Sequence, residues 1–363
     1  MEINEICDNL INEFRSKCSK TFDQSWKQSY LYPILSMQIE YNKESCNKFS
    51  NILNGLFSDY TQSNKVNDFP FIPVRLFKHL ELRNNNEIFR QINSSGTSGA
   101  NVSKIYIDKQ TAQRQTKVLV SLTSDIIGSK RRPMVIFDNN STRESRETFS
   151  ARAAGIGGFT NFGRKPHFCL NKKLEFDFDS TQNYISYYPD IPILGFGFTF
   201  LIWQNVLQSL ISSKKTLKIE KSSVLIHGGG WKKLEHLKVS RNEFNETISK
   251  VLGFDKIINY YGMVEQVGSV FFECSQGYFH APFTSEVIIR CTKTFKPLPF
   301  GEEGLIQLLS IVPSSYPGNS LLTEDIGVCH GEDSCLCGLP GRYFSVIGRK
   351  QNAEVRGCSD VLS

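Results

Sequence analysis

Residues 224–262 read VLIHGGGWKKLEHLKVSRNEFNETISKVLGFDKIINYYG. The apolar run Val224–Gly228 stops at glycines, as a buried parallel strand does when it opens into a loop. An amphipathic helix is predicted over Val239–Leu252, and a second strand-like run follows at Lys256–Asn259. This strand–helix–strand alternation predicts an α/β fold of layered sheets and helices.

Other segments extend this pattern outward in both directions. Residues 1 to about 60 are expected to be helical, because Ile6, Leu10, Ile11 and Phe14 recur at helical spacing. Prolines make Phe69–Lys78 a connector into the core. The remaining expected elements are a helix at Thr111–Leu122 and strands at Ile105–Ile107, Met134–Asp138, Glu286–Arg290 and Gly304–Ser310. We expect an N-terminal helical region (1–68), a core (69–345) and a short C-terminal tail (346–363).

The composition narrows the class of protein. The 363 residues carry 42 Lys+Arg and 36 Asp+Glu, a formal charge of +6. Small basic clusters lie at Lys130–Arg132 and Lys214–Lys221, but they are too sparse to predict a nucleic-acid partner, and they could equally be solvated faces or attract an anionic nucleotide.

No charged leader followed by an apolar stretch begins the chain, and the apolar run Ile191–Trp203 is broken by proline and glycine. We therefore expect neither a signal peptide nor a membrane span, and a cytoplasmic location. The ten cysteines then read as free thiols or metal ligands, because disulfides are rare in that compartment.

A glycine-serine segment, NSSGTSGANVSK (Asn93–Lys104), is the most informative local pattern. Six consecutive small residues offer backbone amides and hydroxyls to an anion: Ser94, Ser95, Gly96, Thr97, Ser98 and Gly99. Glycine permits positive φ, so successive amides can form an anion nest, and Lys104 can add a cation. The segment predicts polyphosphate binding; a flexible surface loop has the same composition.

Four shorter segments suggest the rest of a nucleotide site. In HGGGWKK (His227–Lys233), three glycines let a flat ring approach the backbone, and in NYYGMVEQVGS (Asn259–Ser269) a tyrosine can stack on a purine. Glu265 can hold Mg²⁺ on phosphate oxygens. In TEDIG and IGRK, Asp325 can bind ribose hydroxyls and Arg349 can reach ribose or phosphate. The first two segments also fit ordinary turns, and TEDIG (323–327) and IGRK (347–350) could each have a purely structural role.

The cysteines suggest a metal site and a nucleophile. Cys274 and His280, with Cys335 and Cys337, form two close pairs of the soft ligands that tetrahedral Zn²⁺ prefers. Cys329 and His330 are competing ligands, and free thiols are the alternative reading. Near the C-terminus, Cys358 follows Arg356, whose charge favours the nucleophilic thiolate; an inert tail thiol is the other reading.

Taken in order, these segments resemble the adenylate-forming superfamily of acyl- and aryl-CoA ligases. The narrower resemblance is to the acyl-protein synthetases of the bacterial bioluminescence fatty-acid reductase complex, with phenylacetate–CoA ligase a more distant relative. It covers roughly Phe69–Cys358 and is most specific at SSGTSG and YYGMVEQVGS.

The resemblance implies a two-step reaction. A fatty acid reacts with ATP·Mg²⁺ to give acyl-AMP, and Cys358 then takes the acyl group and delivers it to an acyl-protein reductase. The implied roles are phosphate binding by Ser94–Gly99, adenine binding by Gly228, Gly229, Gly230, Tyr260, Tyr261 and Gly262, Mg²⁺ binding by Glu265 and ribose binding by Asp325 and Arg349.

The chain also departs from the superfamily pattern. Val264 stands where a threonine is usual, and Glu324 where a glycine is usual. The chain ends at Ser363, so the small C-terminal domain with its catalytic lysine is expected to be largely absent, as in the short bioluminescence synthetases. Two rivals stay open: an acyl- or aryl-CoA or carrier-protein ligase, and a nucleotide-binding scaffold that has lost catalysis.

Overall fold

The computed structural model describes residues 3–17, 22–58, 60–94, 102–143, 149–231 and 238–350. The chain forms two compact units. The first comprises Met1–Ser94, Gly99–Ile126 and Gly262–Glu354, and the second comprises Ser95–Ser98, Ile127–Tyr261 and Val355–Ser363. The division predicted at residues 68 and 345 follows chain order, whereas these units do not: the N-terminal helices pack in one unit with residues 262–354.

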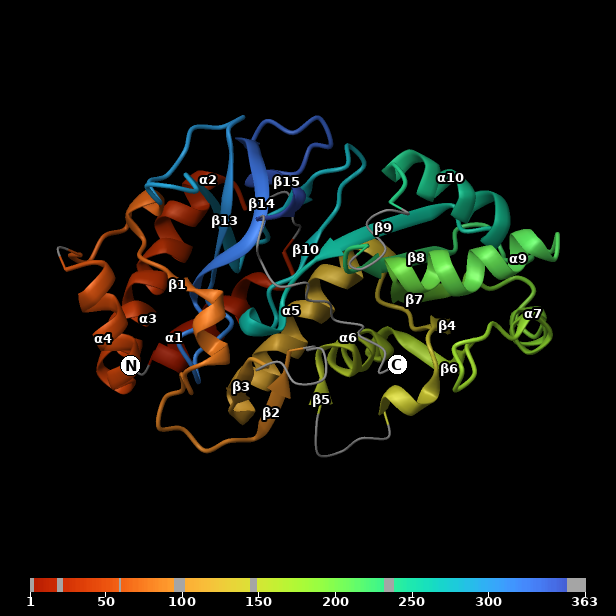
Figure 1. Cartoon of the computed structure of the whole chain (residues 1–363), viewed down its shortest axis with the longest axis horizontal. Helices are drawn as coiled ribbons and strands as arrows, with labels where there is room; N and C mark the ends of the chain where they lie inside the picture. Colours follow the sequence, from red (N-terminus) through yellow and green to blue (C-terminus); the bar gives the residue numbers. More distant parts are fainter. Residues whose placement is uncertain are drawn as a thin grey trace. The chain divides into compact units, whose positions relative to one another are not determined.

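The second unit is built on a parallel sheet. Its strands are β4 (Arg132–Phe137), β6 (Gly163–Phe168), β7 (Leu194–Phe198), β8 (Val224–Gly228) and β9 (Lys256–Tyr261). Neighbours pair in parallel as β6–β4, β4–β7, β7–β8 and β8–β9. Helix α10 (Arg241–Leu252) connects β8 to β9; it begins after the N-cap Ser240 and ends at Gly253, whose φ is +79°. The predicted α/β class is confirmed (Figure 1).

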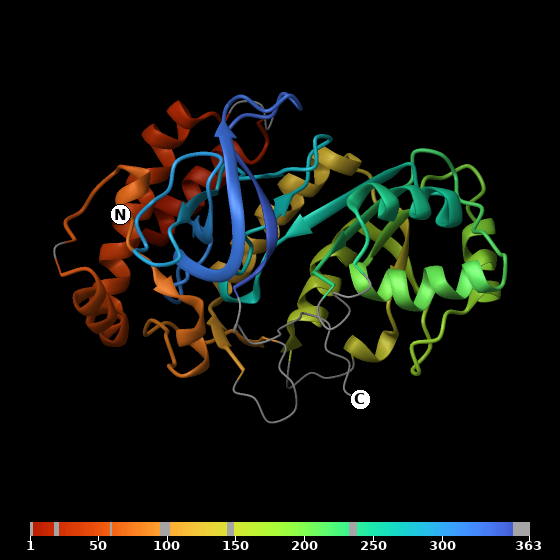
Figure 2. The ribbon, with the colours of Figure 1, turned by 45° about the horizontal axis from the view of Figure 1, so that its top comes forward.

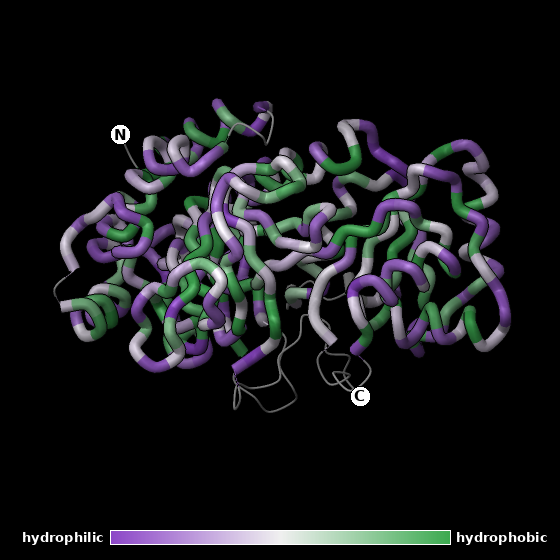
Figure 3. The backbone as a smooth tube through the Cα atoms, turned by 90° about the horizontal axis from the view of Figure 1, so that it is seen from above, coloured by the Kyte–Doolittle hydropathy of each residue, from purple (hydrophilic) through white to green (hydrophobic). Residues whose placement is uncertain are grey.

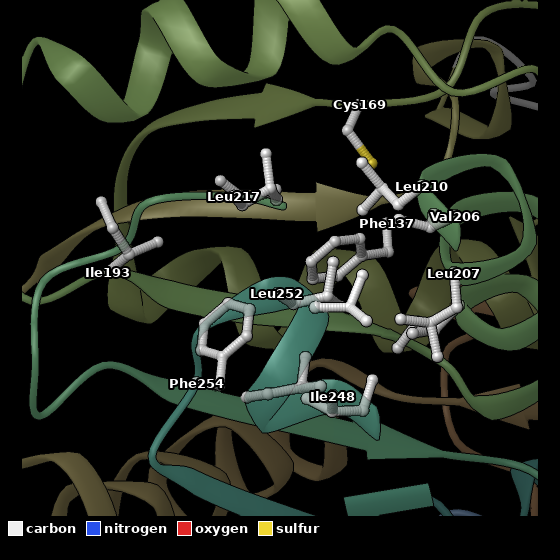
Figure 4. Packing of buried hydrophobic residues seen from close by; sticks show 14 of the residues in the cluster. Phe137, Cys169, Ile193, Val206, Leu207, Leu210, Leu217, Ile248, Leu252 and Phe254 are labelled. Atoms are coloured by element: carbon white, nitrogen blue, oxygen red, sulfur yellow. The ribbon is translucent and has the colours of Figure 1, made fainter. Parts of the chain in front are cut away.

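Strand β7 shows why helices pack on both faces of this sheet. Its sequence LGFGF alternates glycine with phenylalanine. An added Cβ at Gly195 would lie 2.6 Å from Phe254 Cζ, and one at Gly197 would lie 2.7 Å from Phe137 Cβ, so both glycines make room for rings on one face. That face is covered by α10 and by the π-helix η7 (Ile202–Leu207) continuing into α9 (Gln208–Ser212) (Figure 4). On the other face Phe196 stacks on Phe159 of α6 (Ala151–Phe159) at 4.5 Å.

The first unit contains a largely antiparallel sheet. Its strand order is β11 (Phe279–His280), β15 (Arg342–Arg349), β14 (Ser320–Glu332), β13 (Glu303–Ser310) and β12 (Ser285–Arg290), with β1 (Ile72–Pro73) pairing in parallel with β14. The predicted strands at 286–290 and 304–310 are therefore confirmed. The long strands β14 and β15 curve strongly (Figure 2). Register shifts between Ile326 and Gly327 and between Cys329 and Gly331 interrupt their pairing.

Helices of the first unit come mainly from the N-terminal part of the chain, as predicted: α1 (Ile3–Phe14), α2 (Gln24–Trp26), η2 (Lys27–Leu31), α3 (Tyr32–Ser45), α4 (Asn47–Leu56) and α5 (Lys109–Ile127). They are joined to the sheet by a buried ion pair: Lys27 Nζ lies 3.3 Å from Glu286 Oε2 and both side chains are fully inaccessible. Lys27 also donates to the carbonyls of Ala281 and Ser285 at 3.0 Å. Such a pair is tolerated because its donors and acceptors are satisfied.

The connector predicted at Phe69–Lys78 contains β1 and a short 3₁₀ helix, η4 (Val74–Lys78), which begins after Pro73. The other short elements are η3 (Val66–Asp68), η5 (Asn140–Arg143), β5 (Phe149–Ser150), η6 (Thr160–Phe162), α7 (Phe178–Ser186), α8 (Thr199–Leu201), η9 (Val264–Gln266) and β10 (Phe271–Phe272). Figure 3 shows hydrophobic and hydrophilic stretches alternating along the backbone of each unit. Within the described residues, no helix has both the length and the apolar character that a bilayer crossing requires.

Candidate nucleotide and metal sites

A β-hairpin carries the glycine-serine segment. Strands β2 (Arg90–Asn93) and β3 (Lys104–Ile107) pair antiparallel, with Asn93 opposite Lys104. Beyond them Ser94 and Ser103 close the base: the Ser94 N–H donates to the Ser103 carbonyl and the Ser103 N–H donates to Ser94 Oγ, both at 2.9 Å. The hydroxyl of Ser94 thus helps to hold the hairpin. Lys104 is exposed at its mouth, while Ser95–Gly99 lie outside the described residues.

The three glycines after β8 have three different environments. An added Cβ at Gly228 would lie 2.6 Å from Tyr260 Cζ, so the flat ring that approaches this backbone is the tyrosine opposite it on β9. Gly229 has a φ of +79°, which only glycine adopts readily, and a Cβ added at Gly230 would meet none of the described residues beyond its chain neighbours within 4 Å. The ring of Tyr260 also packs against Phe159, with centroids 5.3 Å apart.

His227 precedes these glycines and is buried. Its Nδ1 lies 2.9 Å from Thr199 Oγ1, which in turn donates to the Gly228 carbonyl at 3.2 Å. Burial, aided by the positive charge of Arg241, lowers the pKa of His227 to about 3. The imidazole is therefore neutral at physiological pH and braces the turn that starts the glycine run.

Glu265 is a buried carboxylate on a tightly anchored turn. It is 5% exposed and lies in η9. The next residue, Gln266, donates from Nε2 to the carbonyls of Leu308 and Gly318 at 3.1 and 2.9 Å, and the Val267 N–H donates to Tyr316 Oη at 3.0 Å. Burial, with the Glu265 charge as a further cause, raises the pKa of Tyr316. These contacts fix where the carboxylate stands.

Asp325 and Arg349, predicted separately as ribose contacts, are brought together. They are opposite each other in the β14–β15 pair, and Arg349 Nε donates to Asp325 Oδ1 at 3.2 Å. The Asp325 side chain is 15% exposed and that of Arg349 is 36% exposed. The two side chains form one charged unit on the sheet.

All four predicted soft ligands form one cluster. The ligand atoms of Cys274, His280, Cys335 and Cys337 all lie within 4.8 Å of one another. Cys274 Sγ is 4.0 Å from Cys335 Sγ, and Cys337 Sγ is 3.3 Å from His280 Nε2. Thiolates on a tetrahedral zinc, with Zn–S bonds of about 2.3 Å, stand about 3.8 Å apart, so the donor set and spacing fit that ion.

The backbone around this cluster is shaped for it. The Gly338 N–H donates to the Cys335 carbonyl at 2.9 Å, and the Leu339 N–H donates to Cys337 Sγ at 3.4 Å. Gly277 and Gly338 have φ of +83° and +78°, which close the two ligand-bearing turns. The competing ligands lie elsewhere: His330 Nε2 is 2.8 Å from Ser345 Oγ, and Cys329 Sγ donates to the Gly331 carbonyl at 3.7 Å.

One part of the site was not predicted. Asp138, at the carboxyl end of β4, is fully buried and receives a hydrogen bond from Arg152 Nε at 2.6 Å. The sheet is parallel, so this pair lies at the same edge as the glycine run and Tyr260. The sequence does point to Asp138, because this carboxylate stands at the end of the apolar run 134–138, where a functional loop is expected to begin. Cys358, the predicted nucleophile, lies outside the described residues.

Comparison with known proteins gives the family. The model of the family described as acyl-protein synthetase, LuxE matches residues 36–363. Two curated relatives are named long-chain-fatty-acid–luciferin-component ligase. The relative from Vibrio harveyi is 29% identical over a segment that covers 38% of this chain and 36% of the relative's own length. The relative from Aliivibrio fischeri is 27% identical over 47% of this chain and 44% of its own length. The matched segments thus span less than half of either relative.

Solved structures support the fold. A 2-hydroxyisobutyryl-CoA ligase in an open conformation, in complex with 2-HIB-AMP and CoA, superposes with a TM-score of 0.67 at 14% identity. The superposition covers 92% of this chain and 77% of that one. The same ligase in its postadenylation state gives a TM-score of 0.66 over 91% and 69% of the two chains. With the family match over residues 36–363, these findings establish that the chain belongs to the LuxE family of acyl-protein synthetases.

Proposed function

We propose that this chain activates a fatty acid with ATP and passes the acyl group to a thiol. In the first step a carboxylate oxygen of the acid attacks the α-phosphorus of ATP, the bond from that phosphorus to the oxygen bridging it to the β-phosphate breaks, and pyrophosphate leaves. In the second step the Cys358 thiolate attacks the acyl carbon and AMP leaves. The observation that carries the proposal is the LuxE family match, together with glycine-rich turns at the carboxyl edge of the parallel sheet, where such sheets bind ligands.

The proposed roles follow from the local geometry. The hairpin loop after Ser94, with Lys104 at its mouth, would hold phosphates. Gly228, Gly229, Gly230 and Gly262 would line the adenine. Because Tyr260 is packed against Gly228 and Phe159, we assign adenine stacking to Tyr261, whose side chain leaves the opposite face of β9.

The charged residues complete the proposal. Glu265, fixed by Gln266 and Val267, would bind Mg²⁺ and so neutralise charge on the leaving pyrophosphate. Asp325 would accept from ribose hydroxyls while Arg349 holds its carboxylate in place. Zn²⁺ is proposed on Cys274, His280, Cys335 and Cys337 as a structural ion, because four protein ligands leave no open position for chemistry.

Acid-dependent exchange between ATP and labelled pyrophosphate, measured across a panel of carboxylic acids, tests the first step. We expect long-chain acids to support exchange and Glu265→Gln to lower the rate about 100-fold. Glu302→Gln, the same change at an exposed glutamate of the same unit, is the control and should leave the rate unchanged. Absence of exchange with every acid, in protein that binds ATP, would favour a catalytically inactive scaffold.

Intact-mass measurement after incubation with ATP and the acid tests the second step. Cys358→Ser should retain pyrophosphate exchange and lose the acyl adduct. An adduct that persists in Cys358→Ser contradicts the assignment, and acyl-CoA formation from free CoA would favour the CoA-ligase alternative. By the family resemblance, the acyl group would go on to an acyl-protein reductase, in the cytoplasm where ATP is supplied.

A further inference from the structure

The charge of the chain is unevenly distributed. Residues 127–261 contain 20 lysines and arginines against 12 aspartates and glutamates, whereas the rest of the chain contains 22 against 24. The basic excess thus belongs to the second unit. Balanced surface charge needs no explanation, but an excess confined to one unit suggests that a face of that unit meets something acidic.

Much of this excess gathers at one edge of the parallel sheet. The strands β4, β6, β8 and β9 all begin there, opposite the edge that carries the glycine run, and their first residues or the residues just before them are exposed and basic: Lys130, Arg131, Arg164, Lys165, Lys221 and Lys256. We call these six residues the amino-edge patch. With about 4.8 Å between neighbouring strands, the edge from β9 to β6 spans about 19 Å.

One arginine at this edge makes hydrogen bonds that hold the local backbone. Arg132, which is half-buried behind the patch, donates to the carbonyls of Ile127 and Ser222 at 2.9 Å. Burial and the neighbouring Arg132 charge lower the pKa of Lys256. Three acidic residues share the edge: Asp190, Glu220 and Asp255, of which Asp255 accepts from the Ser222 N–H at 3.1 Å. The basic residues of the patch still outnumber the acidic ones.

An ordered series of aromatic rings stands beside the charges. His167 stacks on Tyr184 at 5.0 Å, Tyr184 packs on Tyr188 at 5.4 Å, and Tyr188 packs on Tyr187 at 5.0 Å. The last ring, Tyr187, is 72% exposed. A large aromatic side chain presented to solvent on a packed support is typical of binding hot spots, because little rotamer entropy remains to be lost.

The charges and the rings are held together. The Arg164 guanidinium lies 5.5 Å from the Tyr188 ring centroid, and Lys165 Nζ lies 5.8 Å from that of Tyr187. The Tyr184 hydroxyl donates to the Lys165 carbonyl at 2.8 Å and accepts from the Met134 N–H at 2.8 Å. Lys165 has a φ of +48°, an unfavourable conformation for a lysine. The end of α7 is thereby fixed beside the start of β6.

We propose that the amino-edge patch and Tyr187 form a docking surface for an acidic protein. Charge complementarity and the supported tyrosine favour a protein over a bilayer, because among the described residues near this edge the exposed aliphatic side chains, such as Ile191 (37%) and Ile211 (48%), are scattered. This surface lies at the edge opposite the proposed nucleotide loops of the same unit. Its occupation is independent of the proposed reaction, and it would leave those loops accessible.

Binding of the full chain to poly-L-glutamate, measured by fluorescence anisotropy at several salt concentrations, tests the proposal. We expect the affinity to fall as salt rises, and Arg164→Glu/Lys165→Glu to weaken it about tenfold. Lys172→Glu/Lys173→Glu is the matched control: the same charge change at exposed lysines after β6, near its other end, should cost less than about twofold. Tyr187→Ala should weaken binding about threefold without changing the net charge.

Three results would overturn the proposal. Equal losses of affinity in the two double variants would mean that any exposed basic residue can bind the polymer and that the patch is not a specific site. An unchanged affinity in Tyr187→Ala would mean that binding is unspecific charge attraction, with no contribution from the tyrosine. Tighter, patch-dependent binding to phosphatidylglycerol vesicles or to a 20-base-pair DNA duplex than to poly-L-glutamate would assign the patch to a different partner. Unchanged melting temperatures of the variants separate loss of binding from loss of fold, and none of these measurements depends on catalysis.

Discussion

At the scale of single residues, Gly228 lies in the proposed adenine-binding segment and is required there for packing. Gly228→Ala would place a methyl group 2.6 Å from Tyr260 Cζ. We expect this overpacking to lower the free energy of unfolding by about 1–3 kcal/mol, as judged by urea denaturation. Gly230→Ala is the matched control, because an added Cβ there meets none of the described residues beyond its chain neighbours within 4 Å, and its effect should be close to zero.

A second measurement at the same position identifies the cause. If the clash with the ring is responsible, Tyr260→Leu should make Gly228→Ala much less costly, giving a coupling of about 1 kcal/mol in a double-mutant cycle. Equal costs for Gly228→Ala and Gly230→Ala, or strict additivity with Tyr260→Leu, would show that the glycine run is constrained by something other than this tyrosine.

His227 makes stability depend on pH. Its pKa is about 3 in the folded chain and about 6.5 in the unfolded chain, so between these values the unfolded state binds the extra proton. Its contribution is fully present above pH 6.5 and is lost as pH falls towards 3, by at most about 1.4 kcal/mol per pH unit. The free energy of unfolding of His227→Asn, measured by denaturation across this range, should change less steeply with pH than that of the wild type, by the amount that one bound proton contributes. His79→Asn, at an exposed histidine, should keep the wild-type slope.

At the scale of elements, the proposed zinc site would stabilise the loop between β14 and β15. Purified without added zinc, the chain should contain about one zinc per molecule, and Cys335→Ser should lose most of it and unfold at a lower temperature. Cys329→Ser alters a buried cysteine that lies close in sequence but outside the cluster, so it should keep the metal. Substoichiometric zinc in the wild type, or equal metal content in the two variants, would contradict the proposed site.

The elements that could be predicted are those whose causes are local. Strand β8, helix α10 and the beginning of β9 follow from apolar runs, the Ser240 cap and Gly253 within one stretch of chain. Strands β14 and β15 could not be predicted in this way. The ribose-binding segments TEDIG (323–327) and IGRK (347–350) carried no prediction of secondary structure. TEDIG lies within β14 and IGR forms the end of β15, because pairing between distant segments overrides their polar composition.

In the candidate site, too, local spacing could be predicted and contacts between distant segments could not. Spacing along the chain was enough to pair Cys274 with His280 and Cys335 with Cys337, but the choice of these four over Cys329 and His330 depends on how β11 pairs with β15. Likewise, the ion pair between Asp325 and Arg349 and the hydrogen bond between Thr199 and His227 are tertiary contacts. Residue type indicated the chemistry, and the fold decided the partners.

At the scale of the whole molecule, the first unit is assembled from three distant parts of the chain, and Arg114 of α5 joins them. Its guanidinium is fully buried and donates to Asp8 Oδ1 at 2.9 Å, to the Asn4 carbonyl at 3.1 Å, to the Val312 carbonyl at 3.1 Å and to Ser314 Oγ at 2.9 Å. A buried charge with this many partners becomes costly when some of them are removed.

A chain that begins at residue 22 tests this dependence. Without α1, Arg114 loses Asp8 and Asn4, so we expect the truncated chain to be less stable by about 3 kcal/mol or more in chemical denaturation. Arg114→Met should cost a similar amount in the full chain and much less in the truncated one, because the truncation has already removed two of the partners that Arg114 would lose. If Arg114→Met costs the same in both chains, α1 stabilises the unit through its apolar face alone, and Arg114 is not the residue that joins the three parts.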